Sequence, residues 1–234
     1  MLSIILNKHS IYVNNLALMP KPKGREAIKA WHRQKIIDAT IDVITEHGIA
    51  GTTIARVVGR AGVSMGLVNV HFNSKDSLLT QVLQQMADEY KAHWHAFLDT
   101  ALPDPVEQLK ALVLADFDPA VLNLKTLGVW FAFRAQARAR PEYIDLVGSR
   151  EREQLQKTIE LFARINRISG QERDPETLAL ALTTMLDGMW TDYFLYPDEF
   201  DRERALGSVF SYLGAMYPGY FKDADHRRVR VLAR

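Results

Sequence analysis

Residues 51–75 constrain the fold of this chain more than any other stretch of the sequence. Within them, apolar residues recur at the spacing of one helical face: Ile54, Val57, Val58 and Ala61. Gly62 follows at the place where a left-handed residue commonly ends a helix, and Ser64 is a good N-terminal cap for the next one. Two short helices joined by a glycine-containing turn form a helix-turn-helix unit.

The second helix of this unit is informative because of the residues on its solvent-facing side. It is expected to bury Val68 and Phe72, with Met65 at the edge of the buried side. The opposite face carries no charge and consists of Gly66, Leu67, Asn69 and Val70, with His71 beside them. Apolar side chains on this face can touch thymine methyl groups, and an Asn can bond an adenine edge or a phosphate. The alternative is a helix buried in an ordinary bundle, which agrees less well with the turn chemistry and the neutral face.

The run Ala61-Gly62-Val63-Ser64-x-Gly66, with Phe72 and Lys75, resembles the DNA-binding domain of TetR-family repressors. The resemblance implies that the following residues face DNA: Thr53, Ser64, Met65, Leu67, Asn69, His71 and Lys75. With the outer-face positions Gly66 and Val70, they form the expected DNA-binding set. The chain departs from the family in having Asn69 where a phosphate-binding Tyr is usual.

Charge is divided unevenly along the chain. Residues 19–80 hold nine Lys/Arg and five Asp/Glu, whereas residues 81–225 hold 15 Lys/Arg and 23 Asp/Glu. A basic part joined to an acidic remainder is typical of a protein that contacts the DNA polyanion at one end. The absence of cysteine excludes disulfides and thiol nucleophiles, and it suits a cytoplasmic protein. The apolar run at residues 2–6 is too short to span a membrane, so no membrane partner is expected.

The remaining sequence predicts an all-α protein, because helical apolar spacing recurs and no segment alternates with a period of two. The expected helices cover residues 28–47, 76–101, 105–117, 120–139, 141–168, 175–195 and 201–216. His93 and His95 suggest a metal site, but two residues apart on a helix they point to different faces. No metal and no cofactor is therefore expected.

Four parts are expected along the chain. They are an N-terminal extension and basic arm at 1–27, a three-helix DNA-binding domain at 28–75, a helical effector-binding and dimerisation domain at 76–217, and a basic tail at 218–234. The first part, and the last part from His226 to Arg234, are expected to be disordered. Because Met19-Pro20-Lys21 looks like a natural protein start, residues 1–18 are either an over-extended reading frame or a genuine extension.

The last two helices are the expected dimer surface. Helix 175–195 carries an apolar stripe with Gly188 among it, and helix 201–216 is apolar around most of its circumference. A helix that is apolar nearly all round is buried on more than one side. Pairing with the same helices of a second copy would bury them in a four-helix bundle, although they would also complete the core of a monomer.

Further short motifs resemble the BetI-type, choline-responsive repressors of glycine-betaine synthesis. These are Asp116-Phe117-Asp118, Trp130-Phe131-Ala132-Phe133 and Leu186-Asp187-Gly188-Met189-Trp190. The resemblance implies a repressor of such genes with a quaternary ammonium effector. Aromatic faces bind such a cation, so the expected effector-binding residues are Trp130, Phe133, Asp187, Trp190 and Tyr193. In the alternative interpretation these aromatic residues belong to the core.

Other function classes fit less well. The sequence contains no nucleophile constellation, glycine-rich phosphate loop or metal-ligand spacing, so an enzyme is not expected. A TetR-type regulator of an efflux pump is the nearest alternative, because such sensors also bind lipophilic cations in aromatic pockets. The operator sequence and the effector's identity do not follow from the sequence.

Overall fold

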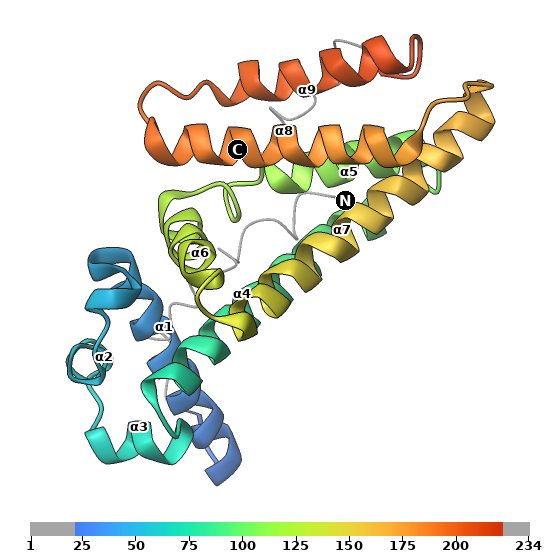
Figure 1. Cartoon of the computed structure of the whole chain (residues 1–234). Coiled ribbons are helices and arrows are strands. Elements are labelled where there is room, and N and C mark those ends of the chain that lie inside the picture. The colour runs from blue at the N-terminus through green and yellow to red at the C-terminus, as the bar shows by residue number, and fades with distance from the viewer. Residues whose placement is uncertain (1–21, 222–234) are drawn as a thin grey trace. The chain divides into compact units, whose positions relative to one another are not determined.

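The structure, a computed structural model, describes residues 22–221, without the side chains of Ser149 and Arg150. Over this range it contains nine helices and no strand, which confirms the all-α prediction (Figure 1). The expected N-terminal extension as far as residue 21, and the basic tail from residue 222, lie outside the described residues. No helix in the described range is both long and apolar enough to cross a bilayer.

The helices form two compact units, each built from two separate stretches of chain. The N-terminal unit comprises residues 22–90 and 125–148, and the C-terminal unit comprises residues 91–124 and 149–221. The N-terminal unit contains α1 (Arg25–Gly51), α2 (Ile54–Ala61), α3 (Met65–His71), the first part of α4 (Lys75–Thr100), most of α6 (Leu124–Ala137) and the start of α7 (Pro141–Ser169). The C-terminal unit contains the rest of α4 and α7 with α5 (Pro105–Asp116), α8 (Pro175–Leu195) and α9 (Arg202–Met216).

The first helix is interrupted at Gly48, where the sequence predicts its end, and continues to Gly51. Gly48 interrupts α1 with φ 65° and ψ 175°, a backbone conformation that favours glycine. Ile49, directly after it, is buried. The inner face of α1 and that of α4 form much of this unit's core, through Ile36, Ile37, Ile41, Ile44, Leu78, Leu79, Val82 and Leu83.

Two carboxyl groups of the N-terminal unit lie where water has little access. Burial raises the pKa of Asp38, on α1, to about 6 and that of Glu89, on α4, to about 7. Gln34 donates to Asp38 over 2.8 Å and Gln85 donates to Glu89 over 2.7 Å, and both bonds partly offset the rise in pKa. Asp38 Oδ2 and Glu89 Oε2 are buried without a hydrogen-bond partner.

The sixth helix begins at Leu124 and not at residue 120, so the predicted start is wrong. Asp118 Oδ1 accepts a hydrogen bond from the backbone N–H of Ala120 over 2.9 Å. Asn123 donates to the carbonyl oxygens of Pro119 and Ala120, both over 3.0 Å. Such side-chain bonds to the backbone compete with helix formation, which keeps this segment as a turn.

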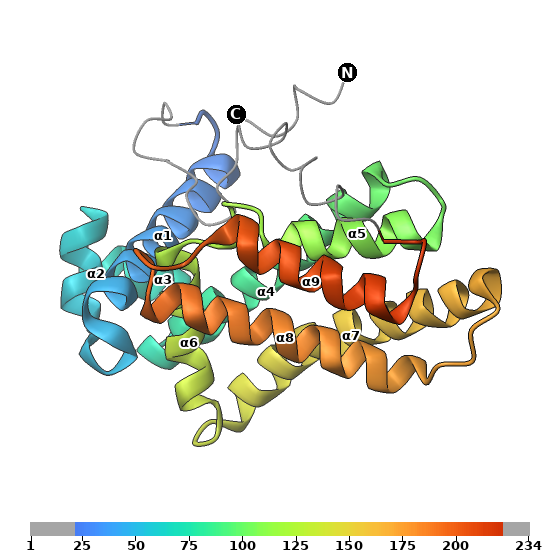
Figure 2. The same cartoon turned by 90° about the horizontal axis from the view of Figure 1, so that it is seen from above.

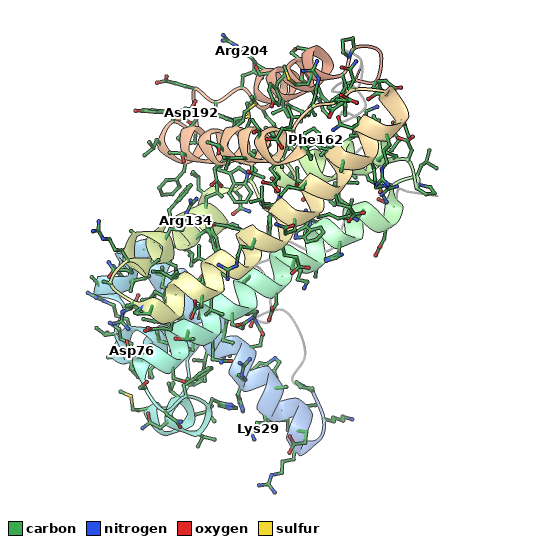
Figure 3. All side chains as sticks on the ribbon, turned by 45° about the vertical axis from the view of Figure 1, so that its right-hand side comes forward. Lys29, Asp76, Arg134, Phe162, Asp192 and Arg204 are labelled. Atoms are coloured by element: carbon green, nitrogen blue, oxygen red, sulfur yellow. The ribbon has the colours of Figure 1, made fainter. Side chains whose placement is uncertain are left out.

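In the C-terminal unit, α8 and α9 run side by side (Figures 1 and 2). Asp174 caps α8 and Asp201 caps α9, each accepting backbone N–H bonds from the first turn. Phe162 of α7, labelled in Figure 3, is fully buried and stacks on Tyr217 with 6.0 Å between the ring centroids. The contact between Phe162 and Tyr217 joins α7 to the end of α9.

Candidate DNA-binding surface and effector site

The predicted helix-turn-helix is present, with Gly62 and Ser64 in their expected places and Thr53 as a further cap. Thr53 caps α2 by accepting the N–H of Arg56 over 3.2 Å, and Ser64 caps α3 by accepting the N–H of Leu67 over 3.2 Å. Gly62 lies between the helices in the left-handed region, at φ 59° and ψ 44°. Each capping hydroxyl accepts with its oxygen, so its own O–H proton is left to donate to a phosphate.

The outer face of α3 is exposed as the sequence predicts. Val68 and Phe72 are buried, whereas Val70 is 70% exposed and Met65 is 47% exposed. Of the other expected DNA-binding residues, Thr53, Ser64, Gly66 and Asn69 are exposed, and Leu67, His71 and Lys75 are half-buried. A side chain added at Gly66 would meet only the Ser64 hydroxyl, at 3.9 Å. The fold itself therefore leaves space at this position for a larger residue.

Three basic residues of α1 lie near His71. Burial is the main cause that lowers the pKa of His71, and the positive charges of His32, Lys29 and Arg33 lower it further. Lys29, labelled in Figure 3, lies close to the N-terminal end of α1. The spacing of residues 29, 32 and 33 on a helix is the pattern from which this cluster could have been predicted.

Arg33 is held within the protein. Its guanidinium donates to the Gln81 side chain on α4 and lies 5.7 Å from the centroid of the Phe72 ring. These contacts connect α1 with α4 and with the residue that ends α3. The cation thus fixes α3 against the rest of the unit.

In the C-terminal unit, Trp190 joins α8 to the end of α5. The indole is almost fully buried, and its Nε1 donates to the backbone carbonyl of Asp116 over 3.1 Å. The Asp116 carboxylate is also buried and accepts from Gln154 Nε2, at 3.2 and 3.4 Å from its two oxygens. A carboxylate and a large aromatic ring therefore lie close together inside this unit.

A second group of polar and aromatic side chains lies beside the turn that follows α5. We call His93, Asp118, Tyr193, Phe200 and Arg202 the Asp118 cluster. His93 Nε2 lies 3.8 Å from Asp118 Oδ1, and the rings of Tyr193 and Phe200 meet edge to face with centroids 5.4 Å apart. Burial lowers the pKa of Arg202, while the charges of Asp118 and Tyr193 raise it. The charges of Asp118 and Tyr193 therefore both act on Arg202.

The predicted effector-binding residues are divided between the two units. Trp190 and Tyr193 belong to the contacts just described, and Asp187 lies half-buried one turn earlier on α8. Trp130 and Phe133 belong to α6 in the N-terminal unit, where both are buried and Phe133 meets Tyr143 edge to face. His93, Phe200 and Arg202 were not among the predicted residues. Only the long-range folding of the chain brings them together.

Two family models match the chain. Residues 36–82 match the model of bacterial regulatory proteins of the tetR family, and residues 105–218 match that of the C-terminal region of BetI-type transcriptional repressors. Together these matches include the helix-turn-helix, the segment from α5 to α9, and every residue of the Asp118 cluster except His93.

Named relatives are similar over nearly their whole length. The HTH-type transcriptional regulator BetI of Stenotrophomonas maltophilia is 30% identical over 195 residues, which is 83% of this chain and 95% of that protein. BetI 2 of Chromohalobacter salexigens is 30% identical over 213 residues, or 88% of this chain and 98% of that protein.

Solved structures share the fold. A proposed transcriptional regulator from Pseudomonas aeruginosa PAO1 has a TM-score of 0.73 and 23% identity, covering 92% of this chain and 98% of that one. Another, from Saccharomonospora viridis, was solved in complex with choline and has a TM-score of 0.70 and 19% identity, covering 79% of this chain and 96% of that one.

Proposed function

Because the chain belongs to the TetR family of bacterial transcriptional regulators, in its BetI-like branch, we propose that it represses genes of choline-to-glycine-betaine metabolism. In this proposal a quaternary ammonium compound such as choline releases the protein from its operator DNA. The single observation that carries the proposal is that the chain has both an exposed, uncharged α3 face and, in the C-terminal unit, a buried group of aromatic and acidic side chains. Such a regulator acts where the DNA is, in the cytoplasm.

DNA contact through α3 divides the exposed residues into two roles. Leu67, Asn69 and Val70 are proposed to contact base edges, while Lys75 and the capping hydroxyls are proposed to bind phosphates. The cations near His71 support this assignment, because phosphates would relieve the repulsion among them.

Replacing Lys75 by alanine is expected to weaken binding to all DNA sequences by a similar factor and to reduce the salt slope by about one unit. Leu67→Ala or Asn69→Ala should instead change the preferred bases, since a good base contact discriminates by about 1–3 kcal/mol. Fluorescence anisotropy with a selected operator and a scrambled duplex, each at several salt concentrations, measures both effects. A change of base preference from Lys75→Ala alone would contradict the assignment.

Dimerisation is proposed to use the outer faces of α8 and α9. The exposed face of α8 includes five uncharged residues, Leu180, Thr184, Gly188, Thr191 and Leu195, with the exposed Asp192 beside them. Nothing lies within 4 Å of a side chain added at Gly188, so the backbone of a second helix can come close. A dimer also matches the two half-sites that helix-turn-helix proteins commonly bind. A molar mass equal to that of a single chain, measured in solution by light scattering, would exclude the dimer.

The effector is proposed to bind in the C-terminal unit. Trp190, Tyr193 and Phe200 supply aromatic rings for a cation that has no proton to donate, and Asp116 and Asp118 supply negative charge. Choline in the Saccharomonospora viridis relative supports this ligand class. A ligand can release DNA only by favouring a conformation that binds DNA less well. α4 is the proposed connection because it belongs to both units.

Choline is expected to weaken operator binding by about 5–150-fold, the range of a typical coupling of about 1–3 kcal/mol. The test is titration of choline chloride into a preformed protein–operator complex, followed by anisotropy. Sodium chloride at the same concentration is the necessary control, because salt alone weakens DNA binding. Linkage also requires the operator to weaken choline binding by the same factor. No release by millimolar choline, in protein that binds DNA well, would favour a regulator of an efflux pump.

A further inference from the structure

Lys125 lies in the first turn of α6 and forms an ion pair with a carboxylate of α1. Its Nζ is 2.6 Å from Asp42 Oδ1, and the two side chains are 30% and 33% exposed. The first turn of α6 contains no acidic residue, and the N-terminal end of a helix disfavours a positive charge. Asp42 offsets this unfavourable charge, so the ion pair holds the beginning of α6 against α1.

The same carboxylate reaches the helix-turn-helix. The second oxygen of Asp42, Oδ2, lies 3.8 Å from Nη1 of Arg60, which stands in the last turn of α2. Glu46, one turn after Asp42 on α1, accepts a hydrogen bond from Nη2 of the same arginine. Lys125, Asp42 and Arg60 therefore form a continuous chain of charges from α6 through α1 to α2. All three belong to the N-terminal unit.

The helix α6 begins directly after the turn that carries Asp118. Asp118 and Asn123 bond the backbone of this turn, which occupies residues 118–123. A ligand that binds beside Asp118 and shifts the turn would carry Leu124 and Lys125 with it, because no linker separates them from the turn. The first residues of α6 therefore follow any movement of the turn.

We propose that Lys125 and Asp42 are positioning residues through which a movement of α6 reaches α2. Chains of ion pairs between rigid helices can carry energetic coupling between two sites. In this proposal the effector shifts the beginning of α6, and Asp42 passes the change to Arg60 at the end of α2. This second connection acts in addition to α4, and neither positioning residue has to touch the effector or the DNA. The inference rests on the proposed function.

The test compares the native chain with Lys125→Met, which keeps most of the aliphatic side chain and removes the charge. The quantity measured by anisotropy is the ratio of the operator Kd with choline chloride to the Kd with sodium chloride at the same concentration. An effect of the lost charge on DNA affinity in general enters both Kd values and cancels in this ratio. We expect the ratio to fall by about twofold to fivefold, as for an ion pair that is partly exposed. Lys125→Arg keeps the charge and should keep the native ratio.

Further variants separate positioning from structural support. Asp42→Asn removes the other partner and should lower the ratio by a similar factor. The double variant should lower it no further, because two residues of one ion pair act together. Lys157→Met is the matched control: Lys157 is 26% exposed and lies 2.9 Å from Glu160, but both residues belong to α7, so their ion pair joins no two helices. A purely structural role of Lys125 would lower the melting temperature and leave the ratio unchanged.

Hydrogen exchange of the α2 amides, measured by mass spectrometry, tests the same connection without choline. These amides should exchange faster in Lys125→Met and in Asp42→Asn than in the native chain, and at the native rate in Lys157→Met. Native exchange in Lys125→Met would overturn the inference. So would a native ratio in Lys125→Met when choline releases the native chain, and that result would leave the proposed function standing. Failure of choline to release the native chain would overturn the proposed effector and this role of Lys125 together.

Discussion

Replacing Trp190 by alanine is expected to lower the free energy of unfolding by about 3–5 kcal/mol, the usual cost of emptying a large aromatic site in a core. The indole is 4% exposed, so its removal leaves a cavity. It also leaves the carbonyl of Asp116 without the indole as a donor. Urea unfolding followed by far-UV circular dichroism measures the change in the full chain.

Two controls define what this result means. Trp190→Phe keeps a six-membered ring and removes the N–H with the rest of the indole, so it should cost about 1–3 kcal/mol, which is less than Trp190→Ala. Tyr196→Ala removes an aromatic side chain that is 55% exposed, and it should change stability by no more than about 0.5 kcal/mol. If Trp190→Ala were as mild as Tyr196→Ala, the buried position of Trp190 would be wrong. Because Trp190→Ala is expected to destabilise the fold, Trp190→Phe is the better variant for effector measurements.

Raising the pH from 5 to 8 is expected to reduce the stability contributed by Asp38 and Glu89. Their folded-state pKa values, about 6 and about 7, lie above the ordinary values of 3.8 and 4.5. Protonation therefore favours the folded state. This contribution is fully present below about pH 4 and is lost as the pH rises through 6 to 7. Solvent screening of these partly exposed groups reduces the loss to on the order of 1–2 kcal/mol each.

The comparison of variants isolates this effect from the histidines, which also titrate in this range. Asp38→Asn and Glu89→Gln remain neutral at every pH, so each should gain stability relative to the native chain as the pH rises from 5 to 8. Asp88→Asn is the matched control, because Asp88 is exposed and adjacent to Glu89. Urea unfolding at both pH values measures the difference. Destabilisation by Asp38→Asn at pH 8 would show that the charge at this position is favourable.

The helix-turn-helix could be predicted from sequence because local chemistry determines it. Thr53, Gly62 and Ser64 each act on the backbone within four residues. The predicted start of α6 was wrong because Asp118 and Asn123 form hydrogen bonds with the backbone between them. The spacing of apolar residues gives no sign of such bonds. Comparable local bonds explain why helix boundaries are harder to predict than helix existence.

The candidate effector site was predicted less completely, for a physical reason. Trp190 was identified as an aromatic residue on α8, but its partner Asp116 is 74 positions away in the chain. His93 and Arg202 are more than 100 positions apart in sequence, and no spacing rule connects them. In the sequence His93 was considered only as a possible metal ligand, whereas the structure places it beside Asp118 and a backbone carbonyl. A group that depends on four separate segments becomes visible only after the chain has folded.

The two bonds at Asp116 place unequal evolutionary constraints on the residues that make them. The bond to Gln154 uses the carboxylate and is lost with most substitutions at position 116. The bond to Trp190 uses a main-chain carbonyl, which every amino acid possesses. Drift at position 116 can therefore alter the charge inside the unit while α5 and α8 stay joined. Substitution of Trp190 removes the donor of this bond, so selection for the fold acts on the tryptophan side chain. The side chain of Asp116 does not make the bond between α5 and α8, so it can change under selection for ligand binding.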